Sequence, residues 1–138
     1  MNLKARGFTL IELMVVVAIV AILATIAFPN YRNYVLRSHR ADGKELAMRI
    51  AAAEERYFTN LNVYTANITG AGPAGLSLSD MSENGYYRAS VQVGNAGQTF
   101  VVTMTPQGGQ SGDQCKNLTI NNTGYKDKTG AETNGKCW

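Results

Sequence analysis

Residues 8–28 read FTLIELMVVVAIVAILATIAF, and this run decides how the rest of the chain is arranged. As an α-helix it extends about 31 Å, which matches the hydrocarbon thickness of a bilayer. Lys4 and Arg6 precede the run without an acidic neighbour. Because basic flanks stay on the cytoplasmic side, the sequence predicts one membrane-spanning helix with everything after it outside the cytoplasm.

One acidic residue interrupts the apolar run. Glu12 follows Phe8 by four residues, and a carboxylate in a membrane is costly unless a positive group offsets it. Cleavage between Gly7 and Phe8 would create an α-ammonium group at the tip of the same helix. In an array of staggered helices, the Glu12 carboxylate of one subunit could pair with the amine of its neighbour. Two simpler interpretations stay open: an i,i+4 pair within one helix, and a Glu12 that lies at headgroup depth.

The segment Gly7-Phe8-Thr9-Leu10-Ile11-Glu12 resembles the processing motif of type IV pilins, with a short basic leader before it and an apolar stretch after it. The resemblance implies cleavage between Gly7 and Phe8 by a membrane prepilin peptidase, N-methylation of Phe8, and a role for Glu12 in assembly. It also implies other partners, namely further pilin subunits, an inner-membrane assembly platform, and membrane lipid before assembly. An ordinary secretory signal would instead be cleaved near Ala27, and the motif would then be a coincidence.

The helix is expected to continue beyond the membrane. Pro29 lacks an N–H and removes the hydrogen bond to the Thr25 carbonyl, which predicts a kink rather than an end. Residues 30–59 are rich in helix formers. A stripe of Leu46, Ile50, Ala53 and Tyr57 recurs at helical spacing, so we expect it to lie against a sheet.

Two features of this second helical half are interpreted without a functional role. Gly43 lowers the helix propensity by about 1 kcal/mol and is a candidate for a second bend. The charged side chains off the stripe are interpreted as a solvated face, with filament neighbours as an alternative contact. They are Arg37, Arg40, Lys44, Arg49, Glu54, Glu55 and Arg56.

The remaining residues, 60–138, are predicted to form a globular β domain. Residues 60–85 are rich in Asn, Gly, Ser and Thr, as in a connecting loop. Apolar residues alternate over 86–93 and 100–104 around a turn at 94–97, which predicts a β-hairpin, and a third strand is expected at 118–120. The predicted fold class is α+β. A long N-terminal helix, membrane-spanning in its first half and kinked at Pro29, packs on a small antiparallel β-sheet with a C-terminal disulfide-bounded loop. The predicted segments are a leader (1–7), a transmembrane and assembly helix (8–29), an amphipathic helix (30–59) and the β domain (60–138).

The two cysteines of the chain, Cys115 and Cys137, are predicted to form a disulfide, with two free thiols as the alternative. So small a domain gains little stability from its core alone, and closing this loop would add roughly 3 kcal/mol. A disulfide implies a periplasmic or extracellular compartment. Four lysines in the same segment could meet DNA phosphates or an acidic host surface, but no interleaved aromatic array favours nucleic acid as a partner. They are Lys116, Lys126, Lys128 and Lys136.

Nothing in the sequence predicts catalysis, a metal or a cofactor. His39 stands alone, and Asp113 and Asp127 lack the spacing of a calcium loop. The chain has thirteen basic and ten acidic residues, and without Lys4 and Arg6 the basic count falls to eleven, so charge gives no global attraction to nucleic acid.

We therefore expect a non-enzymatic pilus subunit. It resembles the minor pilins most, because its globular part is compact and ends almost at the second cysteine. It would begin as an inner-membrane precursor with a periplasmic domain and end in an extracellular filament. That filament would support pilus assembly, twitching motility, adhesion or DNA uptake. Two alternatives remain: a pseudopilin of type II secretion, and a pilin specialised for binding DNA or a receptor.

Overall fold

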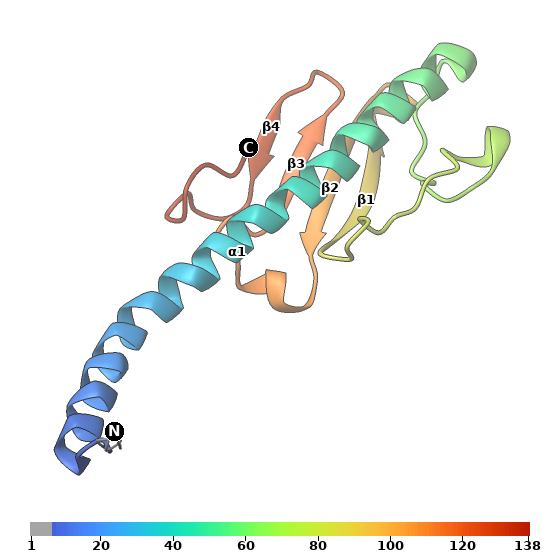
Figure 1. The fold of residues 1–138 in the computed structure, drawn as a ribbon. Helices are drawn as coiled ribbons and strands as arrows, with labels where there is room; N and C mark the ends of the chain where they lie inside the picture. The colour runs from blue at the N-terminus through green and yellow to red at the C-terminus, as the bar shows by residue number, and fades with distance from the viewer. Residues whose placement is uncertain (1–6) are drawn as a thin grey trace. The chain divides into compact units, whose positions relative to one another are not determined.

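The computed structural model describes residues 7–138, so the basic leader residues Lys4 and Arg6 lie outside the described part. One helix, α1 (Leu10–Leu61), is followed by four strands (Figure 1). The strands are β1 (Tyr87–Gly94), β2 (Thr99–Pro106), β3 (Leu118–Asn121) and β4 (Lys126–Lys128). Three short 3₁₀ segments lie between these elements: η1 (Gly72–Ala74), η2 (Asn95–Gly97) and η3 (Gly108–Gly112). The predicted α+β class is confirmed.

The chain divides into two units, the first ending at Tyr34 and the second beginning at Val35. The first unit contains the N-terminal part of α1. Its most apolar 18-residue window has a mean hydropathy of 2.8 and is not buried within the chain, which makes the helix long and apolar enough to cross a membrane. Because α1 includes Pro29, the helix continues past this residue as expected. The kink at Pro29 stays a prediction.

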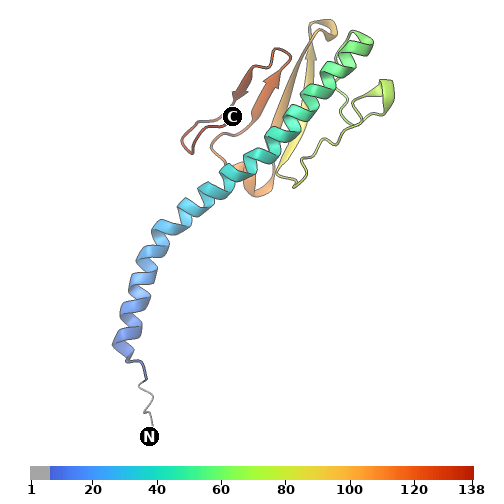
Figure 2. The ribbon, with the colours of Figure 1, turned by 45° about the horizontal axis from the view of Figure 1, so that its top comes forward.

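In the second unit, α1 covers one face of the sheet (Figures 1 and 2). Leu46 and Ile50 are buried in one apolar core with Phe100 and Val102, and Ala53 is buried as well. The predicted stripe is therefore confirmed at these helical positions. Its last member, Tyr57, is half-buried, and its hydroxyl donates a hydrogen bond to the carbonyl of Pro73.

Gly43 has a packing role that the sequence did not reveal. The helix runs through it without interruption, and the glycine is buried. A Cβ atom at this position would lie 2.7 Å from two ring carbons of Tyr87. The absent side chain thus lets the Tyr87 ring pack directly on the helix.

The interpretation of the charged residues of α1 as a solvated face is wrong at two positions. Arg40 is 1% exposed and Glu54 is fully buried. The Arg40 guanidinium binds Asp113, as described below. One carboxylate oxygen of Glu54 accepts a hydrogen bond from the Thr65 N–H at 3.1 Å, and the other is buried without a hydrogen-bond partner among the described residues.

The sheet is antiparallel, with its strands in the order β1-β2-β3-β4. β1 pairs with β2 from Tyr87↔Pro106 to Gly94↔Thr99, and alternate residues of both strands are buried. The predicted hairpin and third strand are therefore confirmed. The fourth strand was missed, because the sequence Lys126-Asp127-Lys128 shows no apolar alternation and forms a strand only by pairing with β3.

Candidate functional site

The first candidate site is the tip of α1. The helix begins at Leu10, directly after Gly7, Phe8 and Thr9. One carboxylate oxygen of Glu12 accepts hydrogen bonds from the Thr9 N–H at 2.9 Å and from the Thr9 hydroxyl at 2.7 Å. In return, the Thr9 hydroxyl oxygen accepts a bond from the Glu12 N–H at 3.3 Å. This reciprocal pattern is a capping box.

Glu12 has a capping role besides its predicted pairing with a cation. The Thr-x-x-Glu spacing of residues 9–12 is the sequence signature of this cap. The cap orients the carboxylate at the helix tip, next to Gly7 and Phe8. It supplies only neutral donors, so the negative charge has no positive partner at the tip among the described residues.

The apolar face of the first unit needs a cover from outside the chain. Phe8 is 92% exposed, and the large apolar side chains from Leu10 to Phe28 are all at least 50% exposed. A soluble monomer rarely exposes a contiguous apolar surface of this kind. Lipid or the helices of other subunits would remove it from water.

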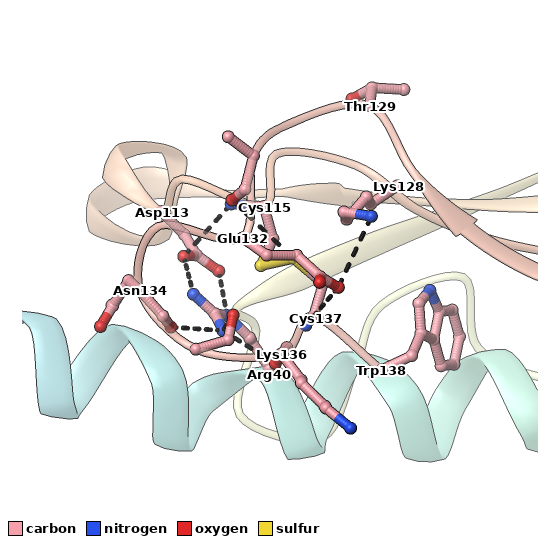
Figure 3. The surroundings of a disulfide bond; sticks show 12 residues. Arg40, Asp113, Cys115, Lys128, Thr129, Glu132, Asn134, Lys136, Cys137 and Trp138 are labelled. Carbon is pink, nitrogen blue, oxygen red and sulfur yellow. Dashed lines mark hydrogen bonds and ion pairs between the residues drawn. A yellow bond between two sulfur atoms is a disulfide. The ribbon is translucent and has the colours of Figure 1, made fainter.

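The second candidate site surrounds the disulfide between Cys115 and Cys137, which forms as expected (Figure 3). Beneath it, Arg40 of α1 donates from Nε and Nη2 to the two carboxylate oxygens of Asp113, at 2.7 and 2.6 Å. Its Nη1 atom donates to the backbone carbonyls of Asn134, Gly135 and Lys136, at 2.9, 3.4 and 3.1 Å. These bonds tie both ends of the disulfide-bounded segment to the helix.

The Arg40–Asp113 pair is shielded from water. The side chains of Arg40 and Asp113 are 1% and 0% exposed, and the hydrogen bonds that Arg40 donates to Asp113 raise the pKa of Arg40 above its ordinary value. Asp113 also accepts a bond from Gln110 Nε2, whose other partners include the Tyr87 hydroxyl. Both carboxylate oxygens of Asp113 thus accept hydrogen bonds from protein groups.

Four lysines gather around this region and are called the lysine cluster: Lys44 of α1, Lys126 and Lys128 of β4, and Lys136 of the loop. Burial lowers the pKa of Lys44, and the nearby charges of Arg40 and Lys126 lower it further. Lys128 Nζ lies 3.5 Å from Glu132 Oε1. Lys126 and Lys136 are exposed to solvent. Two exposed acidic residues, Asp127 and Glu132, lie among these four lysines, so the lysines outnumber the acids here.

An aromatic side chain accompanies the cluster, although the sequence showed no interleaved aromatic array. Lys126 Nζ lies 5.3 Å from the centre of the Trp138 ring, a distance at which a cation and a ring attract one another. The Trp138 indole N–H donates to the Asp127 carbonyl at 2.7 Å. The ring belongs to the last residue of the sequence, so only the folded chain brings it to β4.

Other residues singled out in the sequence have structural contacts. His39 is stacked on Tyr86 at 3.6 Å and forms a hydrogen bond with Gln110 at 3.1 Å, so it is half-buried rather than alone on the surface. Lys116, the fourth loop lysine of the prediction, donates from Nζ to the Ser111 carbonyl. Among residues 7–138, no group of three or more His, Cys, Asp or Glu side chains could hold a metal ion.

Comparison with known families decides the assignment. A sequence model described as "Type IV minor pilin ComP, DNA uptake sequence receptor" matches residues 29–119, more than half of the chain. The chain belongs to this family. A second model, described as "Prokaryotic N-terminal methylation motif", matches residues 2–28, which include the Gly7–Glu12 motif. The resemblance to type IV pilins seen in the sequence is thereby confirmed.

Individual relatives agree with the family. The chain is 40% identical to the fimbrial protein EcpC of Eikenella corrodens over 120 residues, which are 86% of this chain and 74% of that protein. It is 40% identical to the type IV major pilin protein PilE of Neisseria gonorrhoeae over 105 residues, which are 76% of this chain and 58% of that pilin.

A solved structure shows the same fold. A type IV pilin from Shewanella oneidensis superposes with a TM-score of 0.54 at 22% identity, over 75% of this chain and 97% of that one. The pilin and fimbrial matches favour a pilus subunit over the secretion alternative, and they indicate a structural, non-enzymatic role.

Proposed function

We propose that the mature chain begins at Phe8 and polymerises through α1. In this proposal a prepilin peptidase cleaves between Gly7 and Phe8, and Phe8 is then N-methylated. The match of residues 2–28 to the N-terminal methylation motif supports this step, as does the absence of a side chain on Gly7 before the cleaved bond. The Glu12 carboxylate, oriented by Thr9, pairs in the filament with the new α-ammonium group of a neighbouring subunit.

The same proposal gives the chain a route through the membrane. Before assembly, lipid covers the apolar side chains between Phe8 and Phe28. The precursor would span the inner membrane with residues 35–138 on the periplasmic side, where a disulfide is stable. An assembly platform in that membrane then transfers the subunit into an extracellular filament, where other subunits replace lipid around α1.

Within the filament, we propose that the chain binds DNA during uptake. The observation that carries this proposal is the family match, because the family is described as a receptor for DNA uptake sequences. The match covers Lys44 but ends before Lys126, Lys128 and Lys136, so these three rest on their own charge and position. Four cations with one aromatic ring beside them supply the groups that hold a phosphate backbone.

A salt-dependent titration tests the DNA proposal. The full mature chain, in detergent micelles, is titrated with a fluorescent duplex between 50 and 200 mM salt, conditions over which phosphate contacts are strongly screened. We expect log K to fall linearly with log salt, with a slope of about −0.9 for each phosphate contact. Replacing one cation of the cluster, as in Lys126→Ala, should weaken binding and make the slope shallower by about one.

A matched control separates the cluster from net charge. Arg88 lies on β1, the edge of the sheet opposite to β4, and its side chain is 56% exposed. Arg88→Ala removes the same charge as Lys126→Ala, and we expect the affinity for DNA to change little. Absence of salt-dependent binding would contradict the DNA proposal, and equal losses in the two variants would contradict the placement of the site at the lysine cluster.

A further inference from the structure

Two of the contacts that hold the C-terminal loop, the disulfide and the bonds of Arg40, connect different parts of the structure. The disulfide joins Cys115 to Cys137 and so links two parts of the loop region to each other. Arg40 joins Asp113 and the carbonyls of residues 134–136 to α1 (Figure 3). Of these two ties, only Arg40 fixes the pair of segments onto the helix.

The lysine cluster needs such a tie because its members come from separate elements. Lys44 follows Arg40 by one helical turn on α1, whereas Lys136 lies in the loop that Arg40 holds by its backbone. Like charges repel one another, the more strongly the closer they lie. Burial lowers the pKa of Lys44, and the charges of Arg40 and Lys126 lower it further. Lys126 and Lys128 are held by the pairing of β4 with β3, so Lys136 is the member of the cluster whose backbone Arg40 binds directly.

We propose that Arg40 is a positioning residue for DNA binding: it holds the loop of Lys136 against α1 so that Lys136 and Lys44 engage one DNA backbone together. This inference rests on the proposed DNA-binding function. Arg40 itself is 1% exposed, so it does not contact a phosphate and acts only through the groups it holds. Its planar guanidinium bridges one carboxylate and three carbonyls, a set of bonds that the single ammonium of lysine cannot reproduce.

Two variants test the proposal against a simple count of charges. Arg40→Lys keeps the charge but loses the bidentate bond to Asp113 and most carbonyl bonds. Asp113→Asn removes a negative charge beside the cluster, so electrostatics alone would tighten DNA binding. We expect both variants to weaken binding of the full mature chain to a fluorescent duplex by at least about fivefold, and to make the slope of log K against log salt shallower by about one.

Hydrogen exchange of the same detergent-solubilised proteins measures the loop directly. The Cys137 N–H donates to Glu132 at 3.3 Å within the loop, and its exchange should be faster in both variants than in the unmodified chain. Ile50→Val is the matched control, because it weakens the core at a fully buried position without touching the loop. We expect this control to leave the DNA affinity and the exchange of residues 131–138 unchanged.

The outcomes distinguish a failure of the positioning role of Arg40 from a failure of the DNA-binding proposal. Weaker binding with faster loop exchange in both variants would support the positioning role. If the unmodified chain binds DNA but Asp113→Asn binds more tightly, or either variant binds normally, the role of Arg40 is overturned and DNA binding stands. If Ile50→Val weakens binding as much, the effect is one of general stability, and the inference is overturned. If the unmodified chain shows no salt-dependent binding, the proposed function and the inference are both overturned.

Discussion

Two acidic side chains, Glu12 at the tip of α1 and Asp113 beneath the disulfide, are bound in opposite ways. Asp113 is buried, and Arg40 of the same chain neutralises it through two short hydrogen bonds. Glu12 is exposed, and the bonds described at the tip come from the neutral groups of Thr9. The unit from Val35 onward therefore neutralises Asp113 with its own Arg40, whereas in the proposed filament Glu12 is paired with a group of another subunit.

The apolar surfaces of the two units differ in the same way. Leu46 and Ile50 are buried against strands of the sheet, whereas the large apolar side chains from Leu10 to Phe28 are exposed along α1. The C-terminal half of α1 thus buries its apolar side chains within its own domain, whereas the N-terminal half requires lipid or neighbouring subunits to cover them. This division is what a subunit needs if it must fold before it assembles.

The largest expected effect comes from removing the charge at the tip. Glu12→Ala should lower incorporation into filaments by at least about tenfold, because the amine of the neighbouring subunit would lose its partner. Immunoblots of sheared filaments and of membranes measure incorporation, and the mass of the membrane form checks that processing is intact. Glu12→Gln keeps an acceptor for Thr9 without the charge. Normal incorporation of Glu12→Gln would mean that the cap, not the charge, is what assembly uses.

Overpacking at Gly43 tests how tightly the helix packs on the sheet in the unit from Val35 onward. Gly43→Ala places a methyl group 2.7 Å from the Tyr87 ring, and the ring hydroxyl is held by Gln110. We expect a net loss of about 2 kcal/mol in the free energy of unfolding, since overpacking outweighs the gain in helix propensity. Denaturation followed by the fluorescence of Trp138, the single tryptophan, measures it. Gly109→Ala, which has no atom within 4 Å of the new Cβ, should stay near the stability of the unmodified chain.

The buried Glu54 predicts a dependence of stability on pH. Burial raises its pKa from 4.5 to about 6, so the folded chain binds this proton more tightly than the unfolded chain. The stabilisation is complete below pH 4.5 and is lost as the pH rises through 6, by up to about 2 kcal/mol. Glu54→Gln should therefore be more stable than the unmodified chain at pH 7.5, and the two should converge near pH 4.5. A variant that is less stable at pH 7.5 would show that the charged form of Glu54 is favoured in the fold.

The smallest expected effect concerns the cap at the tip. Thr9→Val keeps the branched shape of the side chain but removes the hydroxyl that bonds Glu12. Caps of this kind contribute about 1 kcal/mol, so filament incorporation should fall by about fivefold or less. Thr9→Ser, which retains the hydroxyl, should assemble normally. If Thr9→Val were as defective as Glu12→Ala, orientation of the carboxylate would matter as much as its charge.

The predictable parts of the fold are those with a local pattern. Helical spacing located the stripe of Leu46 and Ile50, and strict alternation located the hairpin of β1 and β2. The cap of Thr9 on Glu12 also has a local signature, and reading the Thr-x-x-Glu spacing as a cap would have found it.

The unpredicted parts depend on contacts between distant residues. In the sequence, Arg40 cannot be told from the solvated charged residues around it. Its burial depends on Asp113, which lies 73 residues later and binds it only in the folded chain. Gly43 looks like a helix breaker until the ring of Tyr87 packs on it. Likewise, Lys126-Asp127-Lys128 has no strand pattern of its own and takes one from β3. At each of these positions tertiary packing overrides the local preference.

The mass of the subunit in sheared filaments is the most direct test of the proposed assembly through the tip of α1. Intact mass spectrometry should find a chain that starts at Phe8 and carries one added methyl group, with the disulfide closed. That chain has an amine where the carboxylate of a neighbouring Glu12 can reach it. A filament subunit that still starts at Met1, or that starts beyond Ala27, would lack this amine, and the account of assembly through the tip of α1 would be wrong.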